Sequence, residues 1–352
     1  MNTKIVRYIL CRMLGVEAAL LLVPVLVAVI YQEKCGIVFL IPIVILCLLF
    51  LMVGRKRPEH GQIYGKEGMV IVALAWILWS LFGAMPFTLS GYIPSYVDAF
   101  FETVSGFTTT GSSIIPDVEV LPHCLLFWRS FTHWIGGMGV LVFVLVVTSL
   151  DRKNSMHLMR AEVPGPEKDK LVPKAMSTAR ILYGMYLTLT VIEMVFLVIG
   201  GMNLFDSMIF SFGSAGTGGF SNYADSVAHF NSAYIDGVIT VFCALFGVNF
   251  ALFYFMILGD FKSILKNEEL RTYILLIAGA TAAIMLNIHS LYPTIGKSFR
   301  YAVFQVVTVI TTTGYSTADF AQWPMFSKAV LMMLTVMLLK RLSALLVVKV
   351  LM

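Results

Sequence analysis

Uncharged stretches long enough to cross a membrane recur along this chain, and they limit its possible folds more than any other feature. Residues 36–53, 69–89 and 237–259 contain no charged side chain. An α-helix needs about 20 apolar residues to cross the hydrocarbon core of a bilayer. Only 13% of the 352 residues are charged, whereas about 25% is usual in a soluble domain. These features exclude an ordinary water-soluble enzyme and predict an all-α integral membrane protein.

We predict eight membrane helices, the last interrupted by Lys340 and Arg341. The first is a retained span, because its apolar stretch is too long for a signal peptide and no A-x-A site follows. Seventeen lysines and arginines lie on one side of this topology and five on the other. Since cytoplasmic loops are rich in Lys and Arg, the N-terminus and residues 151–179 are predicted to be cytoplasmic. The predicted spans are 13–31, 36–53, 69–89, 130–150, 181–205, 237–259, 272–288 and 329–339.

A Thr/Gly-rich segment occurs three times on the predicted outer side, at intervals of about 100 residues, longer than solenoid repeats. We name these segments loop 1 (108–112, TTTGS), loop 2 (215–219, AGTGG) and loop 3 (311–315, TTTGY). Each follows a short aromatic-rich stretch, at 97–107, 204–213 and 298–310. Irregular backbone at membrane depth is tolerated only where it is buried in protein or lines a water-filled cavity. We therefore predict three re-entrant helices that end in pore-lining loops.

The residue types of the loops suit an alkali cation. Glycine allows consecutive carbonyl groups to point the same way, and threonine adds a neutral hydroxyl. Rings of such oxygens can replace the hydration shell of an ion. Asp117, Asp225 and Asp319 follow the loops and could concentrate cations nearby. A helix cap followed by a turn is the alternative interpretation of one such loop, but three copies favour a pore.

Four longer segments resemble the Trk/Ktr/HKT superfamily of potassium transporters, most closely its bacterial Trk potassium-uptake membrane subunits. They are AFFETVSGFTTTG (99–111), WRSFTHWIGGMG (128–139), RAEVPGPEKDKL (160–171) and FQVVTVITTTGYSTADF (304–320). The resemblance implies an N-terminal hairpin followed by repeated helix–pore loop–helix units. It divides the chain into the hairpin with its cytoplasmic loop (1–66) and three pore units (67–178, 179–270 and 271–352).

The resemblance also implies a function: potassium uptake across the bacterial inner membrane, with potassium as the transported ion and no cofactor. Glycine rather than serine at the filter positions favours potassium over sodium. The implied partners are a second copy of the chain, a cytoplasmic nucleotide-binding regulatory subunit and membrane lipids; no nucleic acid is expected. The implied filter residues are Thr109, Thr110 and Gly111 in loop 1, Gly216, Thr217 and Gly218 in loop 2, and Thr312, Thr313 and Gly314 in loop 3.

The end of the chain departs from the family, which continues into a fourth pore unit. Residues 337–352 (MLLKRLSALLVVKVLM) resemble nothing expected there. We therefore expect a truncated or frame-shifted member, and a nonfunctional remnant is one alternative. A membrane-embedded enzyme is the other, using Asp98, Glu102, Arg129 or His133, although no G-x-S-x-G, H-E-x-x-H or Walker A motif is present.

Several other polar residues have simpler interpretations. Arg129 is predicted to anchor a helix end or to pair with an acid. Glu17 is expected to reach the membrane interface, and Glu193 to form an interhelical hydrogen bond or to belong to an ion pathway. The five cysteines include no C-x-x-C pair, so neither a disulfide framework nor a zinc site is predicted.

Overall fold

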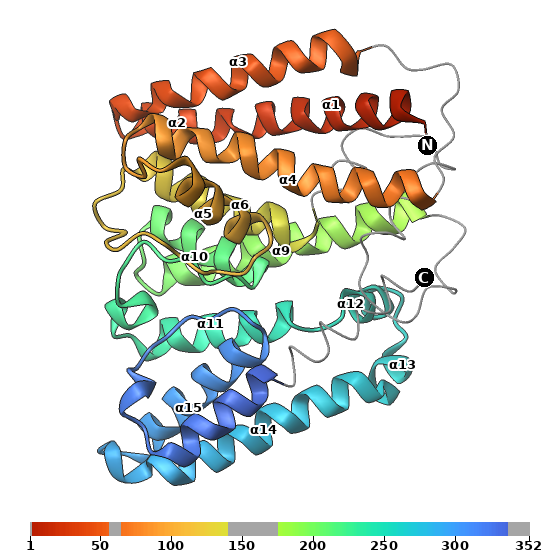
Figure 1. The fold of residues 1–352 in the computed structure, drawn as a ribbon. Helices are drawn as coiled ribbons and strands as arrows, with labels where there is room; N and C mark the ends of the chain where they lie inside the picture. Colours follow the sequence, from red (N-terminus) through yellow and green to blue (C-terminus); the bar gives the residue numbers. More distant parts are fainter. Residues whose placement is uncertain (1, 56–64, 140–174, 337–352) are drawn as a thin grey trace. The chain divides into compact units, whose positions relative to one another are not determined.

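The computed structural model describes residues 2–55, 65–139 and 175–336, and every regular element in these ranges is a helix (Figure 1). This confirms the predicted all-α class. The chain divides into two compact units, Met1–Tyr183 and Gly184–Met352. Three segments discussed above lie outside the described residues: the family-like segment at 160–171, most of the basic loop at 151–179 and the divergent ending at 337–352.

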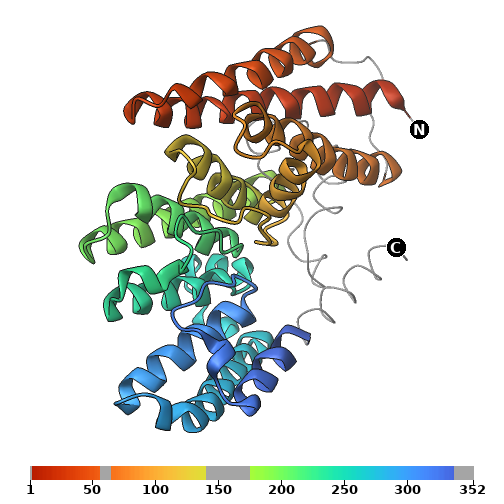
Figure 2. The same ribbon diagram turned by 60° about the vertical axis from the view of Figure 1, so that its left-hand side comes forward.

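The first unit begins with a hairpin of apolar helices that lie side by side (Figures 1 and 2). Its first arm breaks between α1 and α2, because Pro24 in the first turn of α2 cannot donate a backbone hydrogen bond and crowds the carbonyl four residues earlier. The helices of this unit are α1 (Thr3–Leu20), α2 (Leu22–Ile30), η1 (Lys34–Phe39), α3 (Leu40–Leu49), η2 (Phe50–Gly54), α4 (Gly65–Leu89), α5 (Tyr96–Phe107) and α6 (His123–Gly137).

The hairpin also caps α6. Pro122 precedes α6 and supplies no side-chain cap. Instead, the Glu33 carboxylate accepts the backbone N–H groups of His123 (2.7 Å) and Cys124 (3.0 Å). Partial burial disfavours the charged carboxylate, but these hydrogen bonds and one with the His123 ring prevail and lower the pKa of Glu33. A side chain distant in sequence thus satisfies two of the open N–H groups at the start of α6.

The second unit follows within α9 (Ala175–Ile199), which crosses the boundary between the two units. Here α15 packs against both α11 and α14. Buried apolar side chains fill these contacts, among them Phe304 and Val306 of α15. The other helices of this unit are α10 (Leu204–Gly216), η3 (Ser226–Phe230), α11 (Ala233–Phe246), α12 (Phe250–Ile257), α13 (Phe261–Lys266), α14 (Glu268–Ile288), η4 (His289–Leu291), α15 (Ile295–Ile310), η5 (Phe320–Gln322) and a last helix, Met325–Val336.

Five helical segments of the described chain are long and apolar enough to cross a membrane. They correspond to five of the eight predicted spans: Thr3–Ile30, Lys34–Gly54, Lys66–Leu89, Ile181–Ile199 and Glu268–Leu291. The span predicted at 237–259 is not straight, because α11 and α12 meet at an angle of 89°. Asn249 begins α12 by accepting a hydrogen bond from the Ala251 N–H, which starts a new helix after Gly247. The predicted spans 130–150 and 329–339 both continue outside the described residues.

The three aromatic-rich stretches before the loops form short helices, as the sequence predicts. These helices, α5, α10 and α15, have 12, 13 and 16 residues, fewer than the roughly 20 that a straight span requires. Each begins at a polar N-cap whose side chain accepts a backbone N–H: Ser95, Asn203 and Thr294. Each therefore starts at a defined residue and ends at one of the Thr/Gly loops.

Candidate ion-binding loops

The three loops repeat one unusual backbone conformation. A threonine with left-handed φ comes first: Thr109 at 55°, Thr217 at 52° and Thr312 at 60°. A glycine with positive φ follows two residues later: Gly111 at 76°, Gly219 at 75° and Gly314 at 80°. A β-branched residue rarely adopts positive φ. Because such strain persists only where the surrounding structure imposes it, its recurrence in three loops indicates a built feature.

The same two hydrogen bonds close each loop onto the helix before it. In each loop the left-handed threonine donates its N–H to the carbonyl three residues earlier, and the next residue donates to the carbonyl five residues earlier. These bonds engage N–H groups that would repel a cation. The pairs are Thr109–Gly106 and Thr110–Ser105, Thr217–Ser214 and Gly218–Gly213, and Thr312–Val309 and Thr313–Thr308, at 2.8–3.1 Å.

By this shared geometry, the residues of loop 2 that correspond to those of loops 1 and 3 lie one position later than the sequence comparison suggests. The sequence equates Gly216–Thr217–Gly218 with the Thr–Thr–Gly of the other loops, but Gly216 is the last residue of α10. In the structure, Thr217, Gly218 and Gly219 have the equivalent φ pattern and hydrogen bonds. The segment AGTGG has two glycines after its threonine, and the second, Gly219, adopts positive φ.

Loops 2 and 3, which both belong to the second unit, lie against each other. A Cβ added to Gly219 would overlap the backbone carbonyl of Thr313. The buried Tyr315 hydroxyl donates to the Phe210 carbonyl at 3.0 Å. Ser316 accepts the N–H of Ala228 at 3.2 Å. The structure thus brings together loops 2 and 3, which contain six of the nine predicted residues, while Thr109, Thr110 and Gly111 belong to the first unit.

Buried carboxylates accept hydrogen bonds from the segments that follow loops 1 and 2. In the first unit, Glu102 of α5 accepts hydrogen bonds from Ser113 (3.0 Å), from the N–H of Ile114 (2.9 Å) and from Arg129 of α6 (2.6 Å). Arg129 therefore pairs with an acid, as predicted. With these three donors, Glu102 is a structural anchor behind loop 1 and not the free carboxylate that a catalytic role requires.

The second unit repeats this arrangement with different residues. Asp206, near the start of α10, accepts hydrogen bonds from Asn203 (2.7 Å), from Tyr223 (2.8 Å) and from Asn222. Asn222 and Tyr223 follow loop 2, so this cluster resembles the one around Glu102. Farther along the chain, Asp236 of α11 pairs with Arg300 of α15 at 2.6 Å.

The acids that follow the loops engage in local contacts. Asp117 accepts the N–H of Glu119, and Asp319 accepts that of Ala321. Asp225, whose side chain is 56% exposed, lies 3.5 Å from the His229 ring. A role in concentrating cations remains a prediction for all three.

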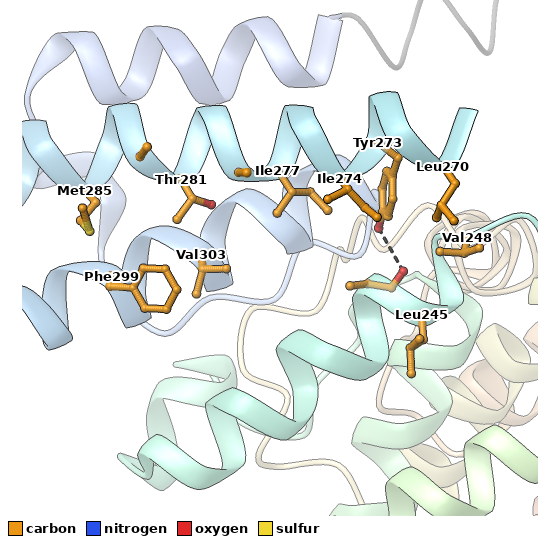
Figure 3. A pocket seen from close by; sticks show the side chains of 13 residues that line it. Leu245, Val248, Leu270, Tyr273, Ile274, Ile277, Thr281, Met285, Phe299 and Val303 are labelled. Atoms are coloured by element: carbon orange, nitrogen blue, oxygen red, sulfur yellow. Dashed lines mark hydrogen bonds between the residues drawn. The ribbon is translucent and has the colours of Figure 1, made fainter. Parts of the chain in front are cut away.

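An apolar cavity of about 570 Å³ lies between α11, α14 and α15 (Figure 3). Its polar side chains are Thr281 and Tyr273, and the Tyr273 hydroxyl already donates to the Ala244 carbonyl at 3.1 Å. No charged group lines it, so it offers an ion little compensation for lost hydration. Among the described residues, no group of three or more His, Cys, Asp or Glu side chains could hold a metal ion.

Together, the apolar spans and the repeated loops after short helices define a multi-pass α-helical membrane protein of the ion-pathway class. The family model TrkH, described as a cation transport protein, matches residues 37–338, and the chain belongs to this family. Its members are transporters and not enzymes, which excludes the membrane-embedded enzyme considered from sequence.

Individual relatives agree with this assignment. The chain is 34% identical to the Trk system potassium uptake protein TrkH of Escherichia coli over 320 residues, covering 89% of this chain and 66% of that protein. It is 32% identical to the Vibrio parahaemolyticus protein of the same name over 329 residues, covering 91% and 68%. The crystal structure of the potassium transporter TrkH from Vibrio parahaemolyticus matches with a TM-score of 0.83 at 30% identity, covering 95% of this chain and 70% of that one. The chain thus spans about two thirds of the length of these relatives.

Proposed function

We propose that this protein carries potassium ions across the bacterial inner membrane, through a pore lined by loops 1, 2 and 3. The repeated loop geometry, in a chain of a cation transport family, is the main support. Relatives named potassium uptake proteins point to potassium as the ion. Potassium is here the transported substrate and not a resident cofactor.

The proposed ion ligands are backbone carbonyl and threonine hydroxyl oxygens of the three loops. Such oxygens can replace the water lost by a potassium ion, and because they are neutral they let the ion leave again. Each loop also follows the C-terminal end of a short helix, where the helix dipole places partial negative charge. Gly216 is the last residue of α10, so we take loop 2 in the register of its backbone conformation. The proposed ligands are then Thr109, Thr110 and Gly111, Thr217, Gly218 and Gly219, and Thr312, Thr313 and Gly314.

The orientation and the partners are part of the same proposal. The surplus of lysine and arginine on one side of the spans supports a cytoplasmic N-terminus and loops that face outward. A second copy of the chain and a cytoplasmic nucleotide-binding regulatory subunit are the proposed partners. The division at residues 66, 178 and 270 into a hairpin and three helix–loop–helix units also belongs here.

Growth of a bacterial strain that lacks its own potassium uptake systems tests this function. The unaltered chain is expected to restore growth at low potassium and to take up Rb⁺. Gly314→Ser should abolish rescue at low potassium, because a side chain there is strained at φ 80° and because serine at this position, by the family resemblance, favours sodium over potassium. Asp98→Asn, on the same type of short helix but away from the loop, should retain it. Failure of the unaltered chain to transport, despite membrane insertion, would reject the proposal and favour the nonfunctional remnant.

A further inference from the structure

Two glutamates lie inside membrane spans with no exposed surface: Glu17 in α1 and Glu193 in α9. Neither carboxyl group has a hydrogen-bond partner within the described residues. Buried, unpaired polar groups are costly, and acids inside a membrane usually have a function. The two sites differ in their surroundings, because Glu17 belongs to the N-terminal hairpin and Glu193 to the unit that contains loops 2 and 3.

Small polar side chains lie beside Glu193. Its carboxyl group interacts with the Ser214 hydroxyl, in the last turn of α10, but the two form no hydrogen bond. Leu197, one helical turn after Glu193, packs in one buried core cluster with Cys243 of α11 and Tyr315 of loop 3. The Cys243 thiol interacts with Glu193 and with the hydroxyls of Ser214 and Thr313. All four residues are buried. We call Glu193, Ser214, Cys243 and Thr313 the interloop cluster.

The interloop cluster connects directly to the backbone of both loops. The Ser214 carbonyl accepts the N–H of Thr217, the left-handed threonine of loop 2, at 3.1 Å. Thr313 belongs to loop 3, and its hydroxyl lies 2.8 Å from that of Thr311. A movement of Ser214 or Thr313 therefore shifts the loop backbone itself.

We propose that Glu193 is a positioning residue for ion selectivity. Its side chain sets how closely α9 packs against Ser214 and Cys243, and thereby the positions of Thr217 and Thr313. Glu193 does not contact the ion, because its side chain has no exposed surface. The inference rests on the proposed function, since it assumes that loops 2 and 3 bind the ion.

The test compares Glu193→Gln, which keeps a polar side chain of similar shape, with Glu193→Leu, which removes it. Uptake of Rb⁺ into proteoliposomes is measured against competing K⁺ or Na⁺. Glu193→Leu is expected to lower the preference for K⁺ over Na⁺ by about three- to tenfold, because an apolar, branched side chain packs differently against Ser214 and Cys243. Glu193→Gln should retain the preference. Glu17→Leu is the matched control: it removes an equally buried acid far from the loops in sequence and should leave the preference unchanged.

A second measurement does not depend on transport. The rise in unfolding temperature caused by K⁺ and by Na⁺ is measured on the same purified proteins, because a bound ion stabilises the folded state. Glu193→Leu should reduce the difference between the rise in unfolding temperature caused by K⁺ and that caused by Na⁺, and Glu17→Leu should leave this difference unchanged. If the unaltered protein is stabilised by K⁺ but transports nothing, the proposed function fails while this comparison still decides the role of Glu193.

Three results would overturn the inference. One is an unchanged ion preference in Glu193→Leu. Another is an equal loss in Glu193→Gln, which would assign the effect to the charge of Glu193 and not to the packing of its side chain. The third is an unaltered protein that K⁺ does not stabilise, which would reject the ion site and the role of Glu193 together.

Discussion

Loops 2 and 3 adopt the same backbone turn, yet the glycine at the end of the turn meets different surroundings in each. At Gly219 a side chain would collide with the carbonyl of Thr313. At Gly314 nothing lies within 4 Å of an added Cβ, so only the φ of 80° requires glycine. The two equivalent positions thus need glycine for different reasons, and only loop 2 combines close packing with backbone strain.

Gly219→Ala should have the largest effect, because it adds a collision with backbone to the strain of positive φ. We expect a destabilisation of about 2–5 kcal/mol and loss of ion uptake. Thermal unfolding of the purified protein and Rb⁺ uptake measure the two effects. A variant with normal stability and uptake would contradict the close contact between loops 2 and 3.

Gly314→Ala should have an intermediate effect, since space is available and only the left-handed conformation is disfavoured. A cost of about 1–2 kcal/mol is expected, with weaker preference for K⁺ over Na⁺. Unfolding midpoints in denaturant measure the cost, and competition uptake measures the preference. An effect as large as that of Gly219→Ala would show that the surroundings of the two glycines do not differ in importance.

Tyr315→Phe removes the hydroxyl that links loop 3 to the Phe210 carbonyl. Its ring remains packed against Phe210, so we expect a loss of about 0.5–1.5 kcal/mol. Thermal unfolding measures it. In the double variant with Gly219→Ala, the loss should be smaller than the sum, because both changes disturb the same contact. Strict additivity would indicate that the two loops are independent.

Gly218→Ala should have the smallest effect, within about 0.5 kcal/mol. Gly218 lacks positive φ, and threonine occupies the equivalent position in the other loops. Paired with Gly219→Ala, this variant tests the register of loop 2 directly. If Gly218→Ala abolishes uptake while Gly219→Ala does not, the register predicted from the sequence is correct and the structural one is wrong.

The sequence predicted the short helices and the three loops, because each aromatic-rich stretch is too short to cross a membrane and the Thr/Gly motif after it repeats. It did not predict which residues of loop 2 correspond to those of the other loops. Two glycines follow Thr217, and the sequence does not show which of them adopts positive φ. The uncharged run at 237–259 likewise suggested a straight span, although Gly247 and Asn249 were available as signals of a break.

Contacts between distant residues were harder to anticipate. The hydrogen bond from Tyr315 to Phe210 and the bonds from Ser113 and Arg129 to Glu102 join segments far apart in sequence. Periodicity and spacing carry no information about such pairs. Only the pairing of Arg129 with an acid was foreseen, because a charge inside an apolar helix requires a partner.

The carboxylate of Glu33 gives the N-terminal hairpin a role beyond anchoring. This carboxylate accepts the N–H groups of the first two residues of α6. Deleting the N-terminal hairpin would therefore leave the first turn of α6 without its hydrogen-bond acceptor. Any shortened design must therefore supply a replacement cap at Pro122, such as serine or aspartate.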